Sequence, residues 1–228
     1  MNSPLRIMLI GAKGKMGRTI KACATGNSSL TISACLDYGD PLEPAIENCE
    51  VVIDFSAAEA TPAICAACAK LGKALVLGTT GHNATQKEPV AAAAQVVPVV
   101  FAANFSTGVN VLFALTKRAV ESLGESFDLD VIEMHHRTKK DAPSGTAKRL
   151  LEILREVRTD RETTAQSIRA GDIVGEHTVI FSGPGERLEL THRAASRETF
   201  ARGALRAARW VTAQPPGLYS MQDVLGLA

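Results

Sequence analysis

The stretch Leu5-Arg-Ile-Met-Leu-Ile-Gly-Ala-Lys-Gly-Lys-Met-Gly17 decides the fold of this chain. A short apolar run leads into a loop with three glycines, and a pattern typical of a helix begins before the loop ends. Gly11 can form the tight turn after the strand, Gly14 can bring the backbone close to a pyrophosphate, and Gly17 can let helix and strand pack closely. The pyrophosphate would lie at the positive N-terminal end of the helix.

The spacing of these glycines differs from the commonest dinucleotide-binding pattern, Gly-x-Gly-x-x-Gly, so the loop alone is weak support for a nucleotide site. Asp37 strengthens the hypothesis, because it closes the next expected strand 20 residues after Gly17, where an acid accepts hydrogen bonds from the adenosine ribose. A triphosphate-binding loop requires Gly at position 9 and Ser or Thr at position 16, where Leu9 and Met16 stand. A glycine-rich turn without a ligand is the remaining alternative.

Short apolar runs alternate with helical patterns along the first part of the chain. The expected strands are residues 5–10, 30–36, 51–55, 74–77 and 98–101, and the expected helices are residues 15–24, 60–70 and 84–94. The strands are continuously apolar rather than alternating, as burial on both faces of a parallel sheet requires. We therefore expect an α/β domain over residues 1–104, with a doubly wound parallel sheet of the Rossmann type.

Two loops follow the fourth and fifth expected strands, Gly78-Thr79-Thr80-Gly81 and Ala102-Ala103-Asn104-Phe105-Ser106. In a doubly wound sheet the ends of these strands border the cleft in which a nicotinamide lies. Both loops are therefore candidate cofactor contacts, although each could serve only as a connection.

The pattern changes after Asn104 to that of an α+β domain. The expected helices are residues 108–123 and 146–157, and the expected strands are residues 127–134, 176–181 and 187–192, with a hairpin turn at 182–186 and a polar loop at 158–164. Residues 105–197 should thus form a smaller domain with a mixed or antiparallel sheet, followed by a helix at 198–212 within the tail 198–228.

The densest polar cluster of the sequence spans residues 133–146 and ends where a helix is expected to begin. Ser144 can cap this helix, and the free N–H groups near Gly145 and Thr146 can bind a carboxylate. These residues are candidates for substrate binding.

His135 can donate a proton near neutral pH, and Lys139 can supply a cation or an acid. With a hydride from a cofactor, such groups suit the reduction of a conjugated imine that bears carboxylates. A solvated charged loop is the alternative for the same run. We expect no metal site, because His135 and His136 are adjacent and would face opposite sides of a strand, without a carboxylate or Cys array to complete a ligand set.

Composition excludes several classes of partner. The 25 basic and 24 acidic side chains give a net charge of +1, so no global field attracts nucleic acid or an anionic membrane. The longest apolar stretch, residues 90–103, is broken by Gln95 and Pro98 and is too short to span a bilayer. The N-terminus has no secretory pattern. We expect a soluble cytosolic protein.

Cysteine usage agrees with a reducing compartment. The five cysteines are an odd number and are expected as free, buried thiols: Cys23, Cys35, Cys49, Cys65 and Cys68. Cys65-Ala-Ala-Cys68 also has the spacing of a redox or zinc motif, but it lies in an Ala-rich segment without a second pair, which favours small core residues on a helix.

These motifs together resemble the 4-hydroxy-tetrahydrodipicolinate reductase (dihydrodipicolinate reductase) family of bacterial lysine and diaminopimelate synthesis. The resemblance extends from end to end of the chain. It rests on Gly11-Ala-Lys-Gly-Lys-Met-Gly-Arg18, Val52-Ile-Asp-Phe-Ser56, Gly78-Thr-Thr-Gly81, Asn104-Phe-Ser-Thr-Gly-Val109, Glu133-Met-His-His-Arg137, Lys139-Lys-Asp-Ala-Pro-Ser-Gly-Thr146, Arg169-Ala-Gly-Asp-Ile-Val-Gly-Glu-His177, Pro216-Gly-Leu-Tyr-Ser-Met221 and Asp223-Val-Leu-Gly226.

The resemblance implies that His135 is the proton donor and that Lys139 assists it, with the substrate's carboxylates held by His136, Ser144, Gly145 and Thr146. It implies a site for NADH or NADPH formed by Gly11, Ala12, Lys13, Gly14, Lys15, Met16, Gly17, Asp37, Gly78, Thr79, Thr80, Ala102, Ala103, Asn104 and Phe105. It further implies a homotetramer built through the C-terminal sheet, and a final helix and tail that return to the nucleotide domain.

The chain departs from the family pattern at three places. The segment from Asp37 to Val51 is short, Tyr38 stands where some members have Arg for a 2′-phosphate, and Thr138 stands where some have a third His. Because Asp37 would repel a 2′-phosphate, we expect NADH to be preferred. Two rival hypotheses remain: an amino-acid dehydrogenase, which leaves residues 135–146 without a role, and a dinucleotide-sensing regulatory module, which needs neither His135 nor Lys139.

Overall fold

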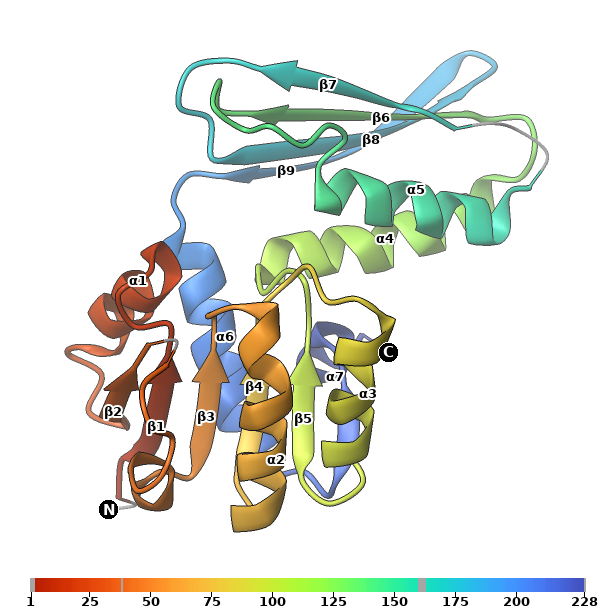
Figure 1. Ribbon diagram of the computed structural model, residues 1–228. Coiled ribbons are helices and arrows are strands. Elements are labelled where there is room, and N and C mark those ends of the chain that lie inside the picture. The colour runs from red at the N-terminus through yellow and green to blue at the C-terminus, as the bar shows by residue number, and fades with distance from the viewer. Residues whose placement is uncertain (1–2, 38, 160–162, 228) are drawn as a thin grey trace. The chain divides into compact units, whose positions relative to one another are not determined.

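The computed structural model describes residues 3–37, 39–159 and 163–227 of the 228-residue chain. Tyr38 and part of the loop expected at 158–164 lie outside the described residues. The chain divides into two compact units, one formed by Met1–Ser106 with Glu198–Ala228 and the other by Thr107–Arg197 (Figure 1). Each unit has its own sheet and is described by itself below.

The first unit contains a six-stranded parallel sheet in the order β10-β5-β4-β3-β1-β2. Its strands are β1 (Leu5–Ile10), β2 (Leu30–Leu36), β3 (Val51–Asp54), β4 (Ala74–Leu77), β5 (Pro98–Phe101) and β10 (Gly217–Tyr219). Its helices are α1 (Lys15–Ala24), α2 (Thr61–Leu71), α3 (Ala84–Ala93), α6 (Glu198–Val211) and α7 (Met221–Leu225), with single 3₁₀ turns at η1 (Ala45–Asn48) and η2 (Ala58–Ala60).

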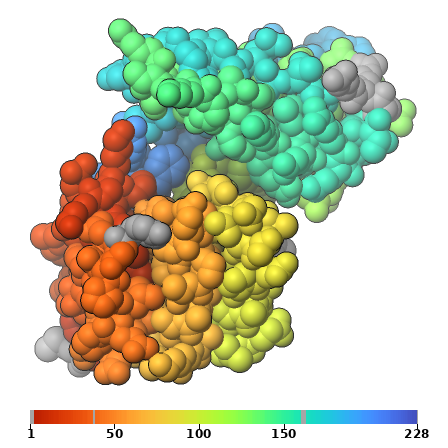
Figure 2. Space-filling view, in the orientation of Figure 1, coloured from red at the N-terminus to blue at the C-terminus, as the bar shows by residue number. Residues whose placement is uncertain are grey.

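Helices cover both faces of this sheet, as expected of a doubly wound fold. Ile7 and Leu9 of β1 pack with α1 and α6 on one face, whereas Met8 and Ile10 pack with α2 and α3 on the other. In Figure 2 the orange and yellow segments, which carry α2 and α3, cover the sheet on the face in view. The α/β architecture predicted from the sequence is confirmed.

Strand β2 corrects one sequence-based expectation. It was expected to be buried on both faces like the others, yet alternate residues such as Thr31, Ser33 and Cys35 are exposed. The reason is its place at the edge of the sheet, where it pairs with β1 alone.

The segment after α6 contains two short elements that the sequence did not predict. β10 pairs with β5 in parallel and thereby extends the first unit's sheet, and α7 follows it. A strand of three residues and a helix of five are too short to show a hydrophobic period.

The second unit contains a four-stranded mixed sheet in the order β7-β6-β8-β9. Its strands are β6 (Asp128–His135), β7 (Ala165–Arg169), β8 (Gly175–Gly183) and β9 (Glu186–Ala194), and its helices are α4 (Thr107–Leu123) and α5 (Gly145–Val157). β6 runs parallel to β7 and antiparallel to β8, and β8 and β9 form a hairpin. The two helices pack on one face, where Val131, Val179 and Phe181 meet Leu112 and Leu150.

Strand β7 was missed, and the hairpin turn is shorter than expected. The sequence Ala-Gln-Ser-Ile-Arg of β7 carries one large apolar side chain, Ile168, so it lacks the pattern of a strand. The expected turn of residues 182–186 is reduced to two residues, because Gly183 pairs with Glu186. Gly185 follows Pro184 in this turn and supplies the positive φ of 81° that a turn with proline in the first central position and glycine in the second uses.

The five cysteines are free, but only part of the burial prediction is correct. Cys49, Cys65 and Cys68 are buried, the last two on α2 as expected, whereas Cys35 is exposed on the edge strand and Cys23 is half-buried. Among the described residues no helix is both long and apolar enough to cross a membrane.

Candidate active site

The glycine loop after β1 has the turn that the sequence predicts. Gly11 has a φ of 80°, and a Cβ there would lie 2.4 Å from the carbonyl oxygen of Phe55. A Cβ on Gly17 would lie 2.2 Å from the carbonyl oxygen of Gly11, so close packing of α1 on this loop requires glycine. Gly14 is the N-cap of α1 and offers no side chain to the helix's free N–H groups. These donors suit an anion such as a pyrophosphate.

Asp37 lies beside this loop. The Lys13 backbone N–H donates to Asp37 Oδ1 at 3.0 Å, and Lys13 Nζ lies 3.5 Å from Oδ2. The predicted ribose acceptor is therefore next to the predicted phosphate loop, with an exposed ammonium group as its neighbour.

The loop after β4 is fixed by a carboxylate that sequence reasoning did not single out. Asp54, at the end of β3, is fully buried. Its Oδ2 accepts from Thr79 Oγ1 at 2.7 Å, and its Oδ1 accepts from the Ser56 N–H at 3.0 Å and from the Ser56 hydroxyl. Burial raises the pKa of Asp54 despite these hydrogen bonds. Of the two threonines in this loop, Thr79 is buried and donates to Asp54, whereas Thr80 is exposed.

The loop after β5 is held by a different set of contacts. The Ala102 N–H donates to the Leu77 carbonyl at 3.2 Å, and Asn104 Oδ1 accepts from the Ser106 N–H at 2.8 Å. Phe105 is buried with its ring 5.5 Å from that of Phe55. Because β1, β3, β4 and β5 are parallel neighbours, the loops at their carboxyl ends lie along one edge of the sheet. The structure thus brings the predicted cofactor residues to a common edge.

In the second unit, the polar cluster begins on the helix-covered face of the sheet. Glu133 and His135 are two residues apart on β6 and are both buried on the same face as Val131. Glu133 lies opposite His177 of β8, and His135 lies opposite Arg169 of β7. Three neighbouring strands therefore place their polar side chains together.

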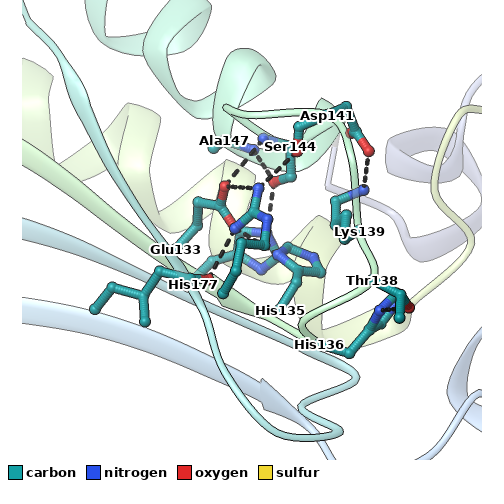
Figure 3. Close-up of polar contacts among 11 residues, drawn as sticks. Glu133, His135, His136, Thr138, Lys139, Asp141, Ser144, Ala147 and His177 are labelled. Atoms are coloured by element: carbon teal, nitrogen blue, oxygen red, sulfur yellow. Dashed lines mark hydrogen bonds and ion pairs between the residues drawn. The ribbon is translucent and has the colours of Figure 1, made fainter.

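Glu133 is the centre of this network (Figure 3). Arg169 donates two bonds to its carboxylate, Nη1 to Oε2 at 2.9 Å and Nη2 to Oε1 at 2.7 Å. The Ser144 N–H donates to Oε1 at 3.2 Å, and His135 Nδ1 contacts Oε2. Burial by itself raises the pKa of Glu133, but hydrogen bonds from Arg169, Ser167 and His135 outweigh it and lower the pKa to about 2.

His135 is buried at the end of β6, where its ring meets that of His177 edge to face at 5.1 Å between centroids. Burial lowers the pKa of His135, although Glu133 opposes this effect. Burial, followed by the nearby His135, lowers the pKa of His177 to about 3. His177 is thus a neutral imidazole at neutral pH.

Ser144 joins the network to the helix. Its Oγ accepts from the Ala147 N–H at 3.2 Å, which confirms the predicted N-cap of α5, and it lies 3.1 Å from His177 Nε2. Gly145 is exposed and Thr146 is half-buried. The first turn of α5 contains no acidic residue, so its N–H groups can receive a carboxylate.

Lys139 and His136 lie on the loop between β6 and α5. Lys139 Nζ donates to Asp141 Oδ1 at 2.7 Å, with about a fifth of the lysine side chain exposed (21%). Arg169 Nη2 donates to the Asp141 carbonyl at 2.6 Å, so the guanidinium also anchors this loop. His136 Nδ1 pairs with Thr138 Oγ1 at 2.8 Å, apart from the buried network.

The sequence singled out His135, Lys139 and Ser144 as candidates but assigned no roles to Glu133, Arg169 or His177. The i, i+2 spacing of Glu133 and His135 was a usable signal, because such residues share a strand face. Arg169 could not be placed without β7, which was not predicted. Among the described residues no group of three or more His, Cys, Asp or Glu side chains is arranged to hold a metal ion.

Comparison with known proteins identifies the family. The family model described as dihydrodipicolinate reductase, N-terminus, matches residues 5–105, and the one described as dihydrodipicolinate reductase, C-terminus, matches residues 108–225. The chain belongs to the dihydrodipicolinate reductase family. As a member of this reductase family the chain is an oxidoreductase, and its N-terminal unit is a pyridine-nucleotide-binding domain.

Relatives agree over the full length of the chain. The 4-hydroxy-tetrahydrodipicolinate reductase of Akkermansia muciniphila is 45% identical over 243 residues, covering 98% of this chain and 99% of the relative. That of Alkalilimnicola ehrlichii is 45% identical over 264 residues, covering 97% and 99%. The family assignment made from the sequence motifs is confirmed.

Solved structures share the fold. A dipicolinate-bound dihydrodipicolinate reductase from Paenisporosarcina sp. TG-14 superposes with a TM-score of 0.83 at 20% identity, covering 96% of this chain and 98% of that one. A diaminopimelate dehydrogenase of C. glutamicum gives a TM-score of 0.55 at 11% identity, covering 97% and 94%. The similarity to the dehydrogenase shows a shared fold and nothing more.

Proposed function

We propose that this protein reduces 4-hydroxy-tetrahydrodipicolinate to tetrahydrodipicolinate with NADH or NADPH, in diaminopimelate and lysine biosynthesis. The observation that carries the proposal is the buried His135, held against an ionised carboxylate one short loop away from the N-terminus of α5. Full-length similarity to 4-hydroxy-tetrahydrodipicolinate reductases supports the same reaction. The hydroxyl leaves as water, and one hydride and one proton are added to the conjugated imine that remains.

The proton is the part of this reaction that the chain supplies. The bound nicotinamide would provide the hydride, whose addition leaves an enamine that must be protonated at the neighbouring atom. We assign this protonation to His135, whose burial and contact with Glu133 fix its position. Lys139, paired with Asp141, places a positive charge in the same loop and assists the transfer.

The substrate's two carboxylates require donors. We assign them to the N–H groups of Gly145 and Thr146 and the Thr146 side chain at the start of α5, together with the hydroxyl of Ser144 and with His136. The Ser144 N–H itself donates to Glu133. Dipicolinate, the ligand named for the Paenisporosarcina reductase, has the same pair of carboxylates on a planar ring.

The nucleotide is assigned to the loops along the carboxyl edge of the first sheet. The pyrophosphate would be held by residues 11–17, the adenosine ribose by Asp37, and the nicotinamide by residues 78–80 and 102–105. NADH is the preferred reductant in this proposal because the Asp37 carboxylate disfavours a 2′-phosphate. No step of the proposed mechanism requires a metal.

We further propose a cytoplasmic homotetramer assembled through the sheet of the second unit. Ile168 of β7 is an exposed apolar side chain on the face of this sheet opposite to α4 and α5. Light scattering on the purified chain would test this state, and a monomer at micromolar concentration would contradict it.

The reaction itself is tested by loss of NADH absorbance when the product of dihydrodipicolinate synthase, made freshly in the same cuvette, is added to the protein. We expect turnover that depends on both the synthase product and this chain. Binding of NADH without turnover would favour a dinucleotide-sensing module, and oxidation of an amino acid instead would favour a dehydrogenase. Either result would overturn the proposal.

The substrate site is tested with pyridine-2,6-dicarboxylate as a competitive inhibitor. Thr146→Val should weaken inhibition by at least about tenfold, because a charge-assisted hydrogen bond is worth about 1.5–3 kcal/mol. Thr163→Val, at a buried threonine outside the α5 N-terminus, is a matched control that should leave the inhibition constant unchanged. Equal inhibition of the parent and Thr146→Val would remove Thr146 from the site.

A further inference from the structure

We infer that Glu133 and Arg169 form a positioning pair that fixes the tautomer of His135, so that Nδ1 always carries a proton and Nε2 is the atom that exchanges one. The inference rests on the proposed function, because it concerns the proton donor of that reaction. Neither residue needs to touch the substrate. Both act through the imidazole of His135.

The tautomer follows from the hydrogen bonds of Glu133. Arg169 donates to both carboxylate oxygens and the Ser144 N–H donates to Oε1, so every one of these contacts requires an acceptor at position 133. The cation and the donors keep the carboxylate ionised, with a pKa of about 2. An ionised carboxylate can only accept, and therefore His135 Nδ1, which contacts Oε2, must be the donor.

The remaining nitrogen of His135 lies on a side left open by a glycine. A Cβ at Gly175 would lie 3.0 Å from His135 Nε2, which is closer than ordinary contact. Gly175 is the first residue of β8 and thus leaves space beside the atom that exchanges the proton. The two edges of the imidazole therefore differ: one is occupied by Glu133 and the other is unobstructed by residue 175.

Four ionisable or charged groups face His135 from the surrounding elements. Of these four described residues, Glu133 on β6 alone favours the imidazolium form of His135. Lys139 and Arg169 oppose it, and His177 is neutral. Burial also disfavours the charged ring. Removal of the negative charge at position 133 should therefore lower the pKa of His135 further.

A Glu133→Gln substitution separates charge from shape. A glutamine at this position has one oxygen and one NH₂ group. If the NH₂ group took the place of Oε1, it would face two other donors, the Ser144 N–H and Arg169 Nη2. Placing the NH₂ at the Oε2 position opposes Arg169 Nη1 and points a donor at His135 Nδ1. The variant should thus reverse the neutral tautomer of His135 and leave the proton on Nε2.

The experiment is a pH titration of the histidine rings by ¹H–¹⁵N NMR on the full chain labelled with ¹⁵N-histidine. The chain has five histidines, and His135→Gln assigns the resonance of interest. The parent should show neutral His135 with its proton on Nδ1, and Glu133→Gln should show it on Nε2 with a lower pKa. Glu152→Gln is the matched control, because Glu152 also accepts from an arginine, Arg149, at 3.0 Å but is exposed on α5. It should leave His135 unchanged.

Steady-state kinetics supply the second readout. Because His135 donates as the imidazolium, kcat should fall as pH rises above its pKa, and Glu133→Gln should move this falling limb to lower pH. A hydrogen bond to a charged group of this kind corresponds to a loss in kcat of about 10- to 100-fold, with the dissociation constant of NADH unchanged. Glu133→Asp, which keeps the charge, should restore part of the pH profile.

The inference is overturned if His135 in the parent carries its neutral proton on Nε2, or if Glu133→Gln changes neither the tautomer nor the pH profile. Should Glu133→Gln fail to fold, Arg169→Lys retains a cation but loses the paired bonds, and the tautomer of the parent decides the question by itself. An inactive parent would refute the proposed function, whereas an active parent with an indifferent Glu133→Gln variant would refute only this inference.

Discussion

Asp54 and Glu133 are both fully buried carboxylates, one in each unit, yet their pKa values are shifted in opposite directions. Burial raises the pKa of Asp54, whose hydrogen-bond donors are two hydroxyls and one backbone amide. The pKa of Glu133 falls to about 2, because a guanidinium and an imidazole join its donors and outweigh burial. A cation at contact distance outweighs the effect of burial on the pKa of a carboxylate, whereas the neutral donors of Asp54 do not.

The difference separates two kinds of task. Asp54 ties the loop after β3 to the loop after β4 and so shapes the nucleotide side of the protein. Glu133 holds a charged site together and gives His135 a permanent acceptor. Replacing Asp54 in the first unit should therefore have a very different consequence from replacing Glu133 or its partner Arg169 in the second.

The largest effect on stability should come from Arg169→Met. The variant leaves Glu133 buried without its cation, and loss of one partner of a buried ion pair typically costs about 3–5 kcal/mol. The free energy of unfolding at neutral pH, measured with urea, should fall by that amount, and the pKa of Glu133 should rise as that of Asp54 does. A loss below about 1 kcal/mol would show that the pair behaves like an exposed one.

Acid should weaken the second unit through His177 and Glu133. The pKa of His177 is lowered to about 3 from 6.5, so its burial favours folding above pH 6.5 and this stability is lost as pH falls toward 3. The pKa of Glu133 is also lowered, so its contribution is lost as pH falls from 4.5 toward 2. His177→Gln should flatten the pH dependence below 6.5 by up to about 1.4 kcal/mol per pH unit.

The measurement is urea unfolding of the parent and His177→Gln between pH 4 and 7. His136→Gln is the control, because His136 is half-buried and lies outside the buried network. Parallel curves for the parent and His177→Gln would mean that His177 is not buried in the neutral form.

Asp37 offers a third carboxylate, partly exposed and paired with an exposed lysine. Asp37→Asn should raise kcat/KM with NADPH relative to NADH by about tenfold, since it removes repulsion of about 1–2 kcal/mol toward a 2′-phosphate. The parent should use NADH at least as well as NADPH. A strong NADPH preference that disappears on replacing Lys13 or Lys15, but not Asp37, would show that the lysines decide selectivity.

Asp54→Asn should give the smallest change. No cation loses its partner, and because the pKa of Asp54 is raised on folding, its ionisation opposes folding as pH rises through that pKa. The free energy of unfolding at neutral pH should change by less than about 1 kcal/mol, with a few-fold weaker NADH binding and little change in kcat. A loss comparable to that of Arg169→Met would remove the distinction between the two carboxylates.

The sequence predicted the first unit better than the second, for physical reasons. Strand β4 is a continuous apolar run and β1 is one interrupted by Arg6 alone, and the bounds of both agree with the expected ones. β7 is an edge strand whose sequence is mostly polar, so no apolar run predicted it. The position of Arg169 in the sheet could therefore not be predicted. His177 ends one of the family motifs, but only the register of β8 against β6 reveals that it lies opposite Glu133.

Among the candidate site residues, the sequence pointed to groups that can transfer a proton and not to the groups that hold them in place. His135 and Lys139 were singled out because their side chains can donate protons near neutral pH. In the sequence, Asp54 and Glu133 look like any solvent-exposed acidic residue. Only their burial and their hydrogen-bond partners in the structure distinguish them.

The central claim is that the second unit supplies the proton and the first unit holds the nucleotide. Its most direct test is steady-state turnover of His135→Gln beside a titration with NADH. Loss of a general acid should lower kcat by about 10²- to 10⁴-fold, while the dissociation constant of NADH stays within about twofold of the parent. Turnover within a few-fold of the parent, in a folded variant, would contradict the account.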